Sequence, residues 1–194
     1  MPPDTLTNAV RATEASGSYR FTLGGSIDVV GQGFPIEGGG AVNTRAGRAR
    51  ATLDLRQALA GSGISSISPA EAVADAVVIG RTLYVRSPYL AKRRGIRSTW
   101  IRYSVRGASL LDYLSAVRSV KLVGSDTIGG VRTTHYTAVV TLTRYPRPLT
   151  VDVWVDSARR IRRLVTQLVQ PSFTAVPQID VSGFGRPVVV TPPR

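Results

Sequence analysis

His135 is the only histidine of the chain and so its only side chain whose ordinary pKa lies near neutrality. It stands in T-T-H-Y, in a stretch that alternates like a β-strand. A Ser-His-Asp triad is defined by geometry rather than spacing, so a hydrolase built on His135 stays open as an alternative. No G-x-S-x-G nucleophile elbow accompanies it, and Ser182-Gly183 lacks that context. We predict that His135 is a hydrogen-bonding residue of a sheet, that there are no catalytic residues and that the protein is not an enzyme.

The carboxylates Asp152 and Asp156 lie four residues apart in V-D-V-W-V-D, which puts both on one face of a strand. Such a pair could serve a glycosidase, but balancing the charge of nearby arginines is the commoner reason for it. The chain has no cysteine and no calcium-loop spacing. The glycines at 31–33 and 38–40 lack the lysine and helix start of a phosphate loop. We therefore expect neither a metal nor a cofactor.

The charge balance is strongly basic, with a formal net charge of +13. Such a field attracts nucleic acid or anionic lipid headgroups. Aromatic residues make up only 7% of the chain and no nucleic-acid-binding motif is present, so stacking surfaces for bases are few and we expect no nucleic acid. We predict instead an anionic membrane surface as a partner, with a solvated rim of arginines as the alternative. The candidate headgroup contacts are Lys92, Arg93, Arg94, Arg97, Arg159 and Arg160.

Apolar and aromatic residues are most concentrated between residues 100 and 117. Their spacing over 109–117 is that of a helix with one apolar face. Such a helix either packs as ordinary core or forms a lid over a lipid cavity, and the residues alone leave both open. The candidate cavity residues are Trp100, Tyr103, Leu110, Leu111, Tyr113, Leu114 and Val117.

The elements expected around these residues are three helices and a long series of strands. Helices are predicted from Thr5 to a stop at Ser16-Gly17, over 69–75 behind the capping box Ser68–Glu71, and over 109–117. Residues 86–99 are predicted to be a basic loop. Strands are predicted at 19–30, 38–43, 50–55, 77–79, 82–85, 100–105, 120–126, 133–142, 149–156, 161–170 and 178–184.

The strands follow one another through short turns, such as Gly129-Gly130, and short connections imply antiparallel pairing. The fold class is therefore α+β, with a large antiparallel sheet. Several later strands carry apolar residues on both faces; Trp154, for example, opposes Val153 and Val155. A sheet of that kind needs cover on both sides.

The length of 194 residues predicts a single domain spanning 1–194. No apolar run reaches the roughly 18 residues of a membrane span. The beginning M-P-P-D-T-L has no signal-peptide character.

The stretch G-S-D-T-I-G-G-V-R-T-T-H-Y at 124–136, followed by V-D-V-W-V-D and the ending D-V-S-G-F-G-R-P, resembles the actinobacterial cell-envelope lipoproteins of the LppX/LprG type. Those are relatives of the periplasmic lipoprotein carrier LolA. The resemblance extends over roughly the whole chain and is specific over its second half. The positions that carry it are Gly124, Gly130, 134–136, Trp154, Asp156 and 183–185.

This resemblance implies a strongly curved antiparallel sheet, an incomplete barrel of the LolA type, with two or three helices across its concave face. It implies an apolar cavity between sheet and helices that takes acyl chains. The expected function is a non-enzymatic lipoprotein that binds or carries lipid or an acylated molecule. An envelope sensor or interaction module of the same fold without a ligand is the alternative. The expected location is outside the cytoplasmic membrane, with an N-terminal lipid anchor; the residues leave the oligomeric state open.

Overall fold

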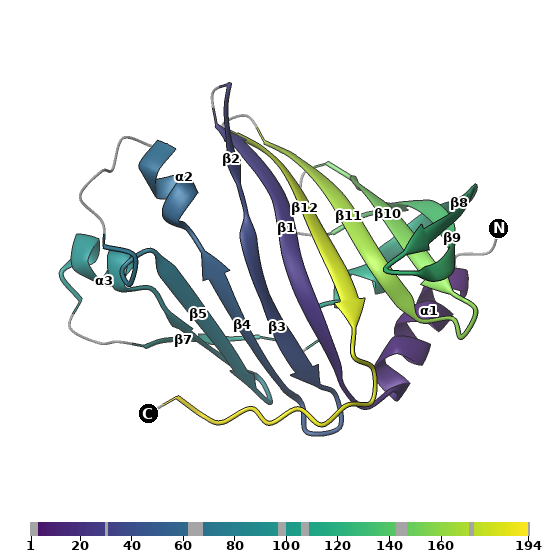
Figure 1. Ribbon diagram of the computed structural model, residues 1–194, viewed down its shortest axis with the longest axis horizontal. Helices are drawn as coiled ribbons and strands as arrows, with labels where there is room; N and C mark the ends of the chain where they lie inside the picture. The colour runs from purple at the N-terminus through teal and green to yellow at the C-terminus, as the bar shows by residue number, and fades with distance from the viewer. Residues whose placement is uncertain are drawn as a thin grey trace.

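The computed structural model describes residues 4–29, 31–61, 68–96, 100–105, 109–142, 147–170 and 173–193. Within these ranges, twelve antiparallel strands form one curved sheet (Figure 1). The sheet order is β7-β6-β5-β4-β3-β1-β12-β11-β10-β9-β8, with β2 continuing the pairing of β3 along β1. Both end strands lack a second neighbour, so the sheet is not closed. The predicted α+β class and incomplete barrel are confirmed.

The helical elements are α1 (Asp4–Ala15), α2 (Arg56–Gly61), α3 (Pro88–Arg94) and the 3₁₀ turn η1 (Asp112–Ala116). The first seven strands are β1 (Tyr19–Val29), β2 (Gln32–Pro35), β3 (Glu37–Asn43), β4 (Arg48–Asp54), β5 (Val73–Ile79), β6 (Thr82–Arg86) and β7 (Ile101–Ser104). The remaining strands are β8 (Val117–Ile128), β9 (Val131–Val140), β10 (Leu149–Asp156), β11 (Ile161–Gln170) and β12 (Phe173–Ser182).

Tight turns at glycines set the pairing of neighbouring strands. Gly129 and Gly130 both have positive φ, 55° and 77°, as a two-residue hairpin turn between β8 and β9 requires. The predicted turn there is confirmed, as are the predicted hairpins β3–β4 and β5–β6.

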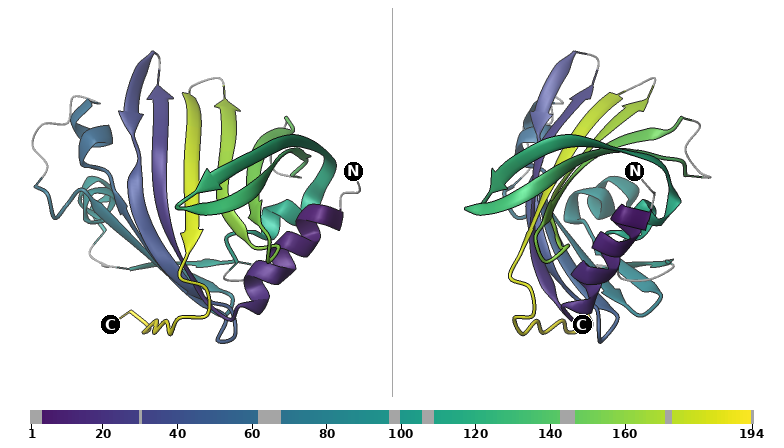
Figure 2. Two further views of the ribbon diagram at one scale, coloured as in Figure 1. Left: turned by 45° about the vertical axis from the view of Figure 1, so that its right-hand side comes forward. Right: turned by 90° about the vertical axis from the view of Figure 1, so that its right-hand side faces the viewer.

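One half of the concave face is filled by α1 and η1. Figure 2 shows the sheet bending round α1. Leu6 and Ala9 of α1 are buried, and they belong to one core cluster with residues of β9, β10 and β11. The Thr13 hydroxyl donates to the Ala9 carbonyl at 2.7 Å and accepts the Ile161 backbone N–H at 2.9 Å. This second bond fixes the helix to the start of β11.

A β-bulge at the start of β11 changes the face that one apolar residue of this strand occupies, compared with simple alternation. Val155 pairs with Ile161 and Trp154 pairs with Arg163, so Arg162 is an extra residue. The bulge turns Ile161 to the same concave face as Leu164, and both are fully buried. Sequence alternation had placed them on opposite faces.

The convex face also has a cover, provided by the chain after β12. Val188 and Val190 are buried against Ala41, with Val77 and Ile79 at the edge of this small cluster. Asn43 donates to the Val188 carbonyl at 3.0 Å, and Arg48 donates to the Val190 carbonyl at 3.1 Å. We call residues 186–193 the C-terminal tail; Figure 1 shows it running beneath the ends of the strands.

Three local predictions were wrong. The Ser68–Glu71 capping box forms its hydrogen bonds, but only a turn follows, because the chain enters β5 at Val73. The predicted helix over 109–117 is the shorter η1, and β8 begins at Val117. The loop predicted over 86–99 contains α3, capped by the Ser87 side chain and ended by Gly95 in the left-handed conformation.

Candidate functional site

The concave face is covered unevenly along the sheet. Under α1 and η1, the concave residues of β9 and β10 are buried, and Val140, Val151 and Val153 are fully so. At the other end of the sheet, every residue of β5 is only partly buried. Figure 1 shows α2 and α3 at this other end, apart from α1.

The partly exposed concave residues of β5, β6 and β7 form a continuous apolar surface. Val78 pairs with Leu83, and Leu83 pairs with Tyr103. The next row along the strands also joins three apolar residues across the same strands. This surface, which we call the open wall, consists of Ala74, Ala76, Val78, Leu83, Val85, Ile101 and Tyr103.

The open wall shares a face with the core. Ala49 and Ala51 on β4 pair with Val78 and Ala76. Ala49 belongs to the buried core, and Val78 packs against that core from its edge. The wall is therefore an exposed extension of the core surface.

The structure divides the predicted cavity residues between core, wall and opposite face. Leu111 and Leu114 are fully buried, and Leu110, Tyr113 and Val117 pack against them. Burial raises the pKa of the Tyr113 phenol. The last two predicted residues are not part of this cluster: Tyr103 lies on the open wall, 47% exposed, and Trp100 lies on the convex face.

The position of Trp100 follows from strand register. Ile101 pairs with Val85 of the open wall, so the preceding residue, Trp100, points to the other side beside Arg86. The Arg86 guanidinium lies over its indole, 5.3 Å from the ring centroid. Sequence reasoning grouped Trp100 with Leu110 by proximity in the chain and missed most of the wall. The alternation of apolar residues in 73–79 and 82–86 was the available signal.

His135 lies on the convex face of β9 in a polar cluster. Its Nε2 is 3.0 Å from Asp152 Oδ1, and its ring stacks on Trp154 with centroids 4.1 Å apart. The Thr137 hydroxyl donates to the same Asp152 oxygen. Among the described residues, no serine or threonine hydroxyl bonds to the imidazole. The contacts give the imidazole a carboxylate and a stacking partner, and those described include no nucleophile.

Asp156 ties the β10–β11 turn together. Its side chain is 1% exposed and accepts hydrogen bonds from the Arg160 backbone N–H at 2.9 Å and from Arg162 Nε at 2.8 Å. The Arg160 side chain adds a third bond. Both guanidinium groups also lie over the Phe184 ring, at 4.7 and 4.8 Å. Arg160, predicted to meet headgroups, is thus engaged within the fold.

The other predicted headgroup contacts fall into two places. Lys92, Arg93 and Arg94 are exposed in the last turn of α3, where positive charges interact favourably with the negative end of the helix dipole. Lys92 forms an ion pair with Glu71 at 2.9 Å. The hydrogen bond from Lys92 and those from Ser68 together lower the pKa of Glu71 to about 2. Arg159 is exposed at the β10–β11 turn, toward the other edge of the sheet. Arg97 lies outside the described residues.

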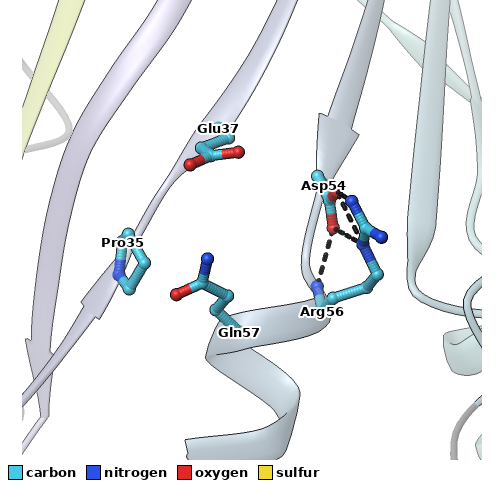
Figure 3. Close-up of a pocket in the computed structure, with 5 residues that line it drawn as sticks. All are labelled: Pro35, Glu37, Asp54, Arg56 and Gln57. Atoms are coloured by element: carbon cyan, nitrogen blue, oxygen red, sulfur yellow. Dashed lines mark hydrogen bonds and ion pairs between the residues drawn. The ribbon is translucent and has the colours of Figure 1, made fainter.

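A polar hollow of about 270 Å³ opens beside α2 (Figure 3). Glu37 of β3 and Asp54 of β4 are paired across it, with Pro35 and Gln57 on its rim. Arg56 donates to both Asp54 oxygens, and these bonds hold the Asp54 pKa below its usual range. The charged side chains that line this hollow make it unsuited to an acyl chain.

No protein-family model matches this chain, and no curated protein sequence matches it. Among the described residues, no helix is both long and apolar enough to cross a membrane.

The open antiparallel sheet curved round an N-terminal helix is the fold of the mycobacterial LppX-type lipoproteins. The structure of LprF from Mycobacterium bovis matches with a TM-score of 0.58 at 15% identity, covering 98% of this chain and 96% of that one. The lipoprotein LppX of Mycobacterium tuberculosis matches with a TM-score of 0.57 at 15% identity, covering 97% of each chain. The fold implied by the sequence resemblance is confirmed.

Proposed function

We propose that this protein binds lipid acyl chains against the open wall and acts as a non-enzymatic carrier in the cell envelope. The observation that carries the proposal is an apolar surface, continuous with the core, that the protein leaves partly exposed. Exposed apolar surfaces of this kind commonly mark ligand or membrane contacts.

An acyl chain suits this surface for a simple energetic reason. Each methylene moved from water to an apolar contact contributes about 0.8 kcal/mol. The wall residues are alanine, valine, leucine and isoleucine apart from Tyr103, so they offer few polar groups that a hydrocarbon would leave unpaired. The ligand is thus a lipid or an acylated molecule.

The location we propose is outside the cytoplasmic membrane, held there by an N-terminal lipid. The support is the likeness in fold to LppX, which is a lipoprotein. Exposed Arg159 lies beside the start of α1, since both line one surface hollow. An anchor attached ahead of α1 would bring that arginine close to anionic headgroups.

The test is uptake of a fluorescent fatty acid by Leu83→Arg, compared with Thr82→Arg. Leu83 faces the open wall, whereas its neighbour Thr82 faces the convex side, and both are partly exposed. Leu114 is unsuited to such a test, because a charge at that fully buried site would disrupt the core itself.

We expect Leu83→Arg to lose at least about tenfold in affinity for the fatty acid, since the bound acyl chain would remove water from a charge on the open wall. Thr82→Arg should bind like the wild type, and circular dichroism should show both variants folded. Equal binding by the two variants would place the lipid elsewhere. A wild type that takes up no fatty acid would favour an interaction module of the same fold.

A further inference from the structure

The convex face carries a further hollow, which we call the convex hollow, on the side of the sheet opposite the open wall. It has a volume of about 450 Å³, within the range of small-molecule sites. Residues of β4, β5 and β6 line it, together with Trp100 and residues of the C-terminal tail. Its principal side chains are Arg50, Thr52, Asp75, Arg86, Trp100 and Pro192.

One side of the hollow is a connected series of charged and aromatic groups. Arg86 Nε donates to Asp75 at 3.0 Å, and the Thr52 hydroxyl donates to the other Asp75 oxygen at 3.1 Å. The same guanidinium lies over the Trp100 ring. Arg86 is therefore held on two sides, which fixes its remaining N–H groups.

Arg50 supplies a second cation without such engagement. It is exposed, and none of the described ion pairs includes it. Of the charged side chains lining the hollow, Asp75 is already balanced by Arg86, so Arg50 leaves the hollow with a net positive charge.

The C-terminal tail contributes apolar side chains to the hollow and is held in place. Pro192 and Pro193 line the hollow together with Trp100, and the tail that carries them is fixed by buried Val188 and Val190. Hydrogen bonds from Asn43 and Arg48 to tail carbonyls add to this. The lining of the hollow thus combines an indole ring and two proline rings with hydroxyl and carboxylate oxygens and an excess positive charge.

We infer that this convex hollow binds an anionic sugar, a pyranose that carries a phosphate or carboxylate group. A pyranose has apolar C–H faces for the indole and proline rings, and hydroxyls for the Asp75 and Thr52 oxygens. Its anionic group pairs with Arg50 and the free N–H groups of Arg86, as arginine does with phosphate and carboxylate. This site is independent of the lipid proposal, because it lies on the other face of the sheet.

The hollow suits neither an acyl chain nor a nucleic-acid strand. A hydrocarbon would take water away from the Arg50 guanidinium and offer it no partner. A nucleic-acid strand needs successive stacking platforms along a basic groove, and Trp100 is the one aromatic ring among the described lining residues.

The experiment is isothermal titration calorimetry of the whole chain with glucose 6-phosphate, glucose and inorganic phosphate. We expect glucose 6-phosphate to bind, with affinity falling as salt rises, and each fragment alone to bind at least about tenfold more weakly. Binding of inorganic phosphate as tight as that of the sugar phosphate would overturn the proposal, because Trp100 would then contribute nothing.

Matched variants test the assignment to this hollow. Arg50→Gln should weaken glucose 6-phosphate by about tenfold, and Arg81→Gln, which removes an exposed charge on the β5–β6 turn, should leave it unchanged. Trp100→Leu, which keeps an apolar side chain, should weaken it as well. Equal affinity in the wild type and in Arg50→Gln would sink the idea, since the Arg50 side chain is exposed and its replacement should leave the fold intact.

A competition experiment distinguishes a lipid headgroup from a free or polymer-borne sugar as the natural ligand. Vesicles of phosphatidylcholine with glucuronosyl diacylglycerol, whose headgroup is an anionic pyranose, displace bound glucose 6-phosphate if the ligand is a lipid headgroup. Failure to displace it supports a free or polymer-borne anionic sugar.

Discussion

At the scale of single residues, Asp156 is the one charged residue that is buried in the described part of the chain. Its carboxylate forms ion pairs with both Arg160 and Arg162. Burial by itself would raise its pKa, but the hydrogen bonds from the Arg160 backbone and the two side chains hold the pKa below its usual range. The carboxylate is thus present in its charged form to join the β10–β11 turn to Phe184.

Asp156→Asn should lower the free energy of unfolding by about 3 kcal/mol at pH 7, as removing one partner of a buried ion pair does. A carboxyl whose pKa is depressed on folding stabilises the protein above its unfolded pKa of about 3.9, and this contribution is lost as pH falls through the folded pKa. The variant and the wild type should therefore converge in stability below about pH 4.

Urea denaturation from pH 7 to pH 2 measures this difference. Asp28→Asn is the control, because an amide oxygen can still accept the Gly31 N–H that Asp28 accepts. A gap between Asp156→Asn and the wild type that stays constant with pH would contradict the role given to the charge.

At the scale of elements, close packing of the sheet depends on a few glycines. Gly40 of β3 has no room for a side chain: an added Cβ would lie 2.1 Å from the Arg50 carbonyl and 2.6 Å from the Phe21 ring. Phe21 is 7% exposed and belongs to the core. The absence of a Cβ at Gly40 lets this ring lie across the neighbouring strand.

Gly40→Ala should therefore destabilise the protein by about 2–3 kcal/mol, since backbone atoms must shift to admit the methyl group. Gly24→Ala on β1 is the matched control, because nothing lies within 4 Å of its Cβ position and its φ is not positive. Thermal unfolding compares the two. Similar melting temperatures for both variants would show that β3 can move away from Phe21 at little cost.

At the scale of the whole molecule, the charge is spread over several surfaces. The net charge of +13 favours anionic partners in general, but only clusters near one another act together on a membrane. The α3 cluster, Lys92, Arg93 and Arg94, is the densest exposed group among the predicted headgroup contacts.

Replacing the α3 cluster by glutamines should reduce binding to anionic vesicles by about tenfold or more, since each cation near the surface contributes about 1 kcal/mol. Replacing Arg118, Lys121 and Arg132 on the β8–β9 hairpin removes the same charges elsewhere and is the control. Co-sedimentation at low and high salt provides the measurement. An equal loss in both triple variants would assign the binding to net charge alone.

Much of the fold could be read from local patterns. The period of two, the glycine turns and the short connections predict an antiparallel α+β fold, because strand period and turn geometry depend on near neighbours. The first helix and the Gly129-Gly130 hairpin lie where they were predicted. The resemblance in 124–136 and 151–156 indicated the LppX-type fold, which the structure confirms.

Tertiary structure alone decided which face several side chains occupy. Trp100 is convex and Tyr103 concave because β7 pairs with β6 in a particular register, and Ile161 is concave because Arg162 bulges. It also decided that the Ser68–Glu71 turn does not continue as a helix, because the ladder of β4 takes up the residues from Val73 onward. Strand registers, bulges and the segments that cover each face arise from contacts between parts of the chain that are far apart in sequence. A local stretch of sequence therefore does not determine them by itself. The division of the concave face into a covered core and an open wall follows from those distant contacts.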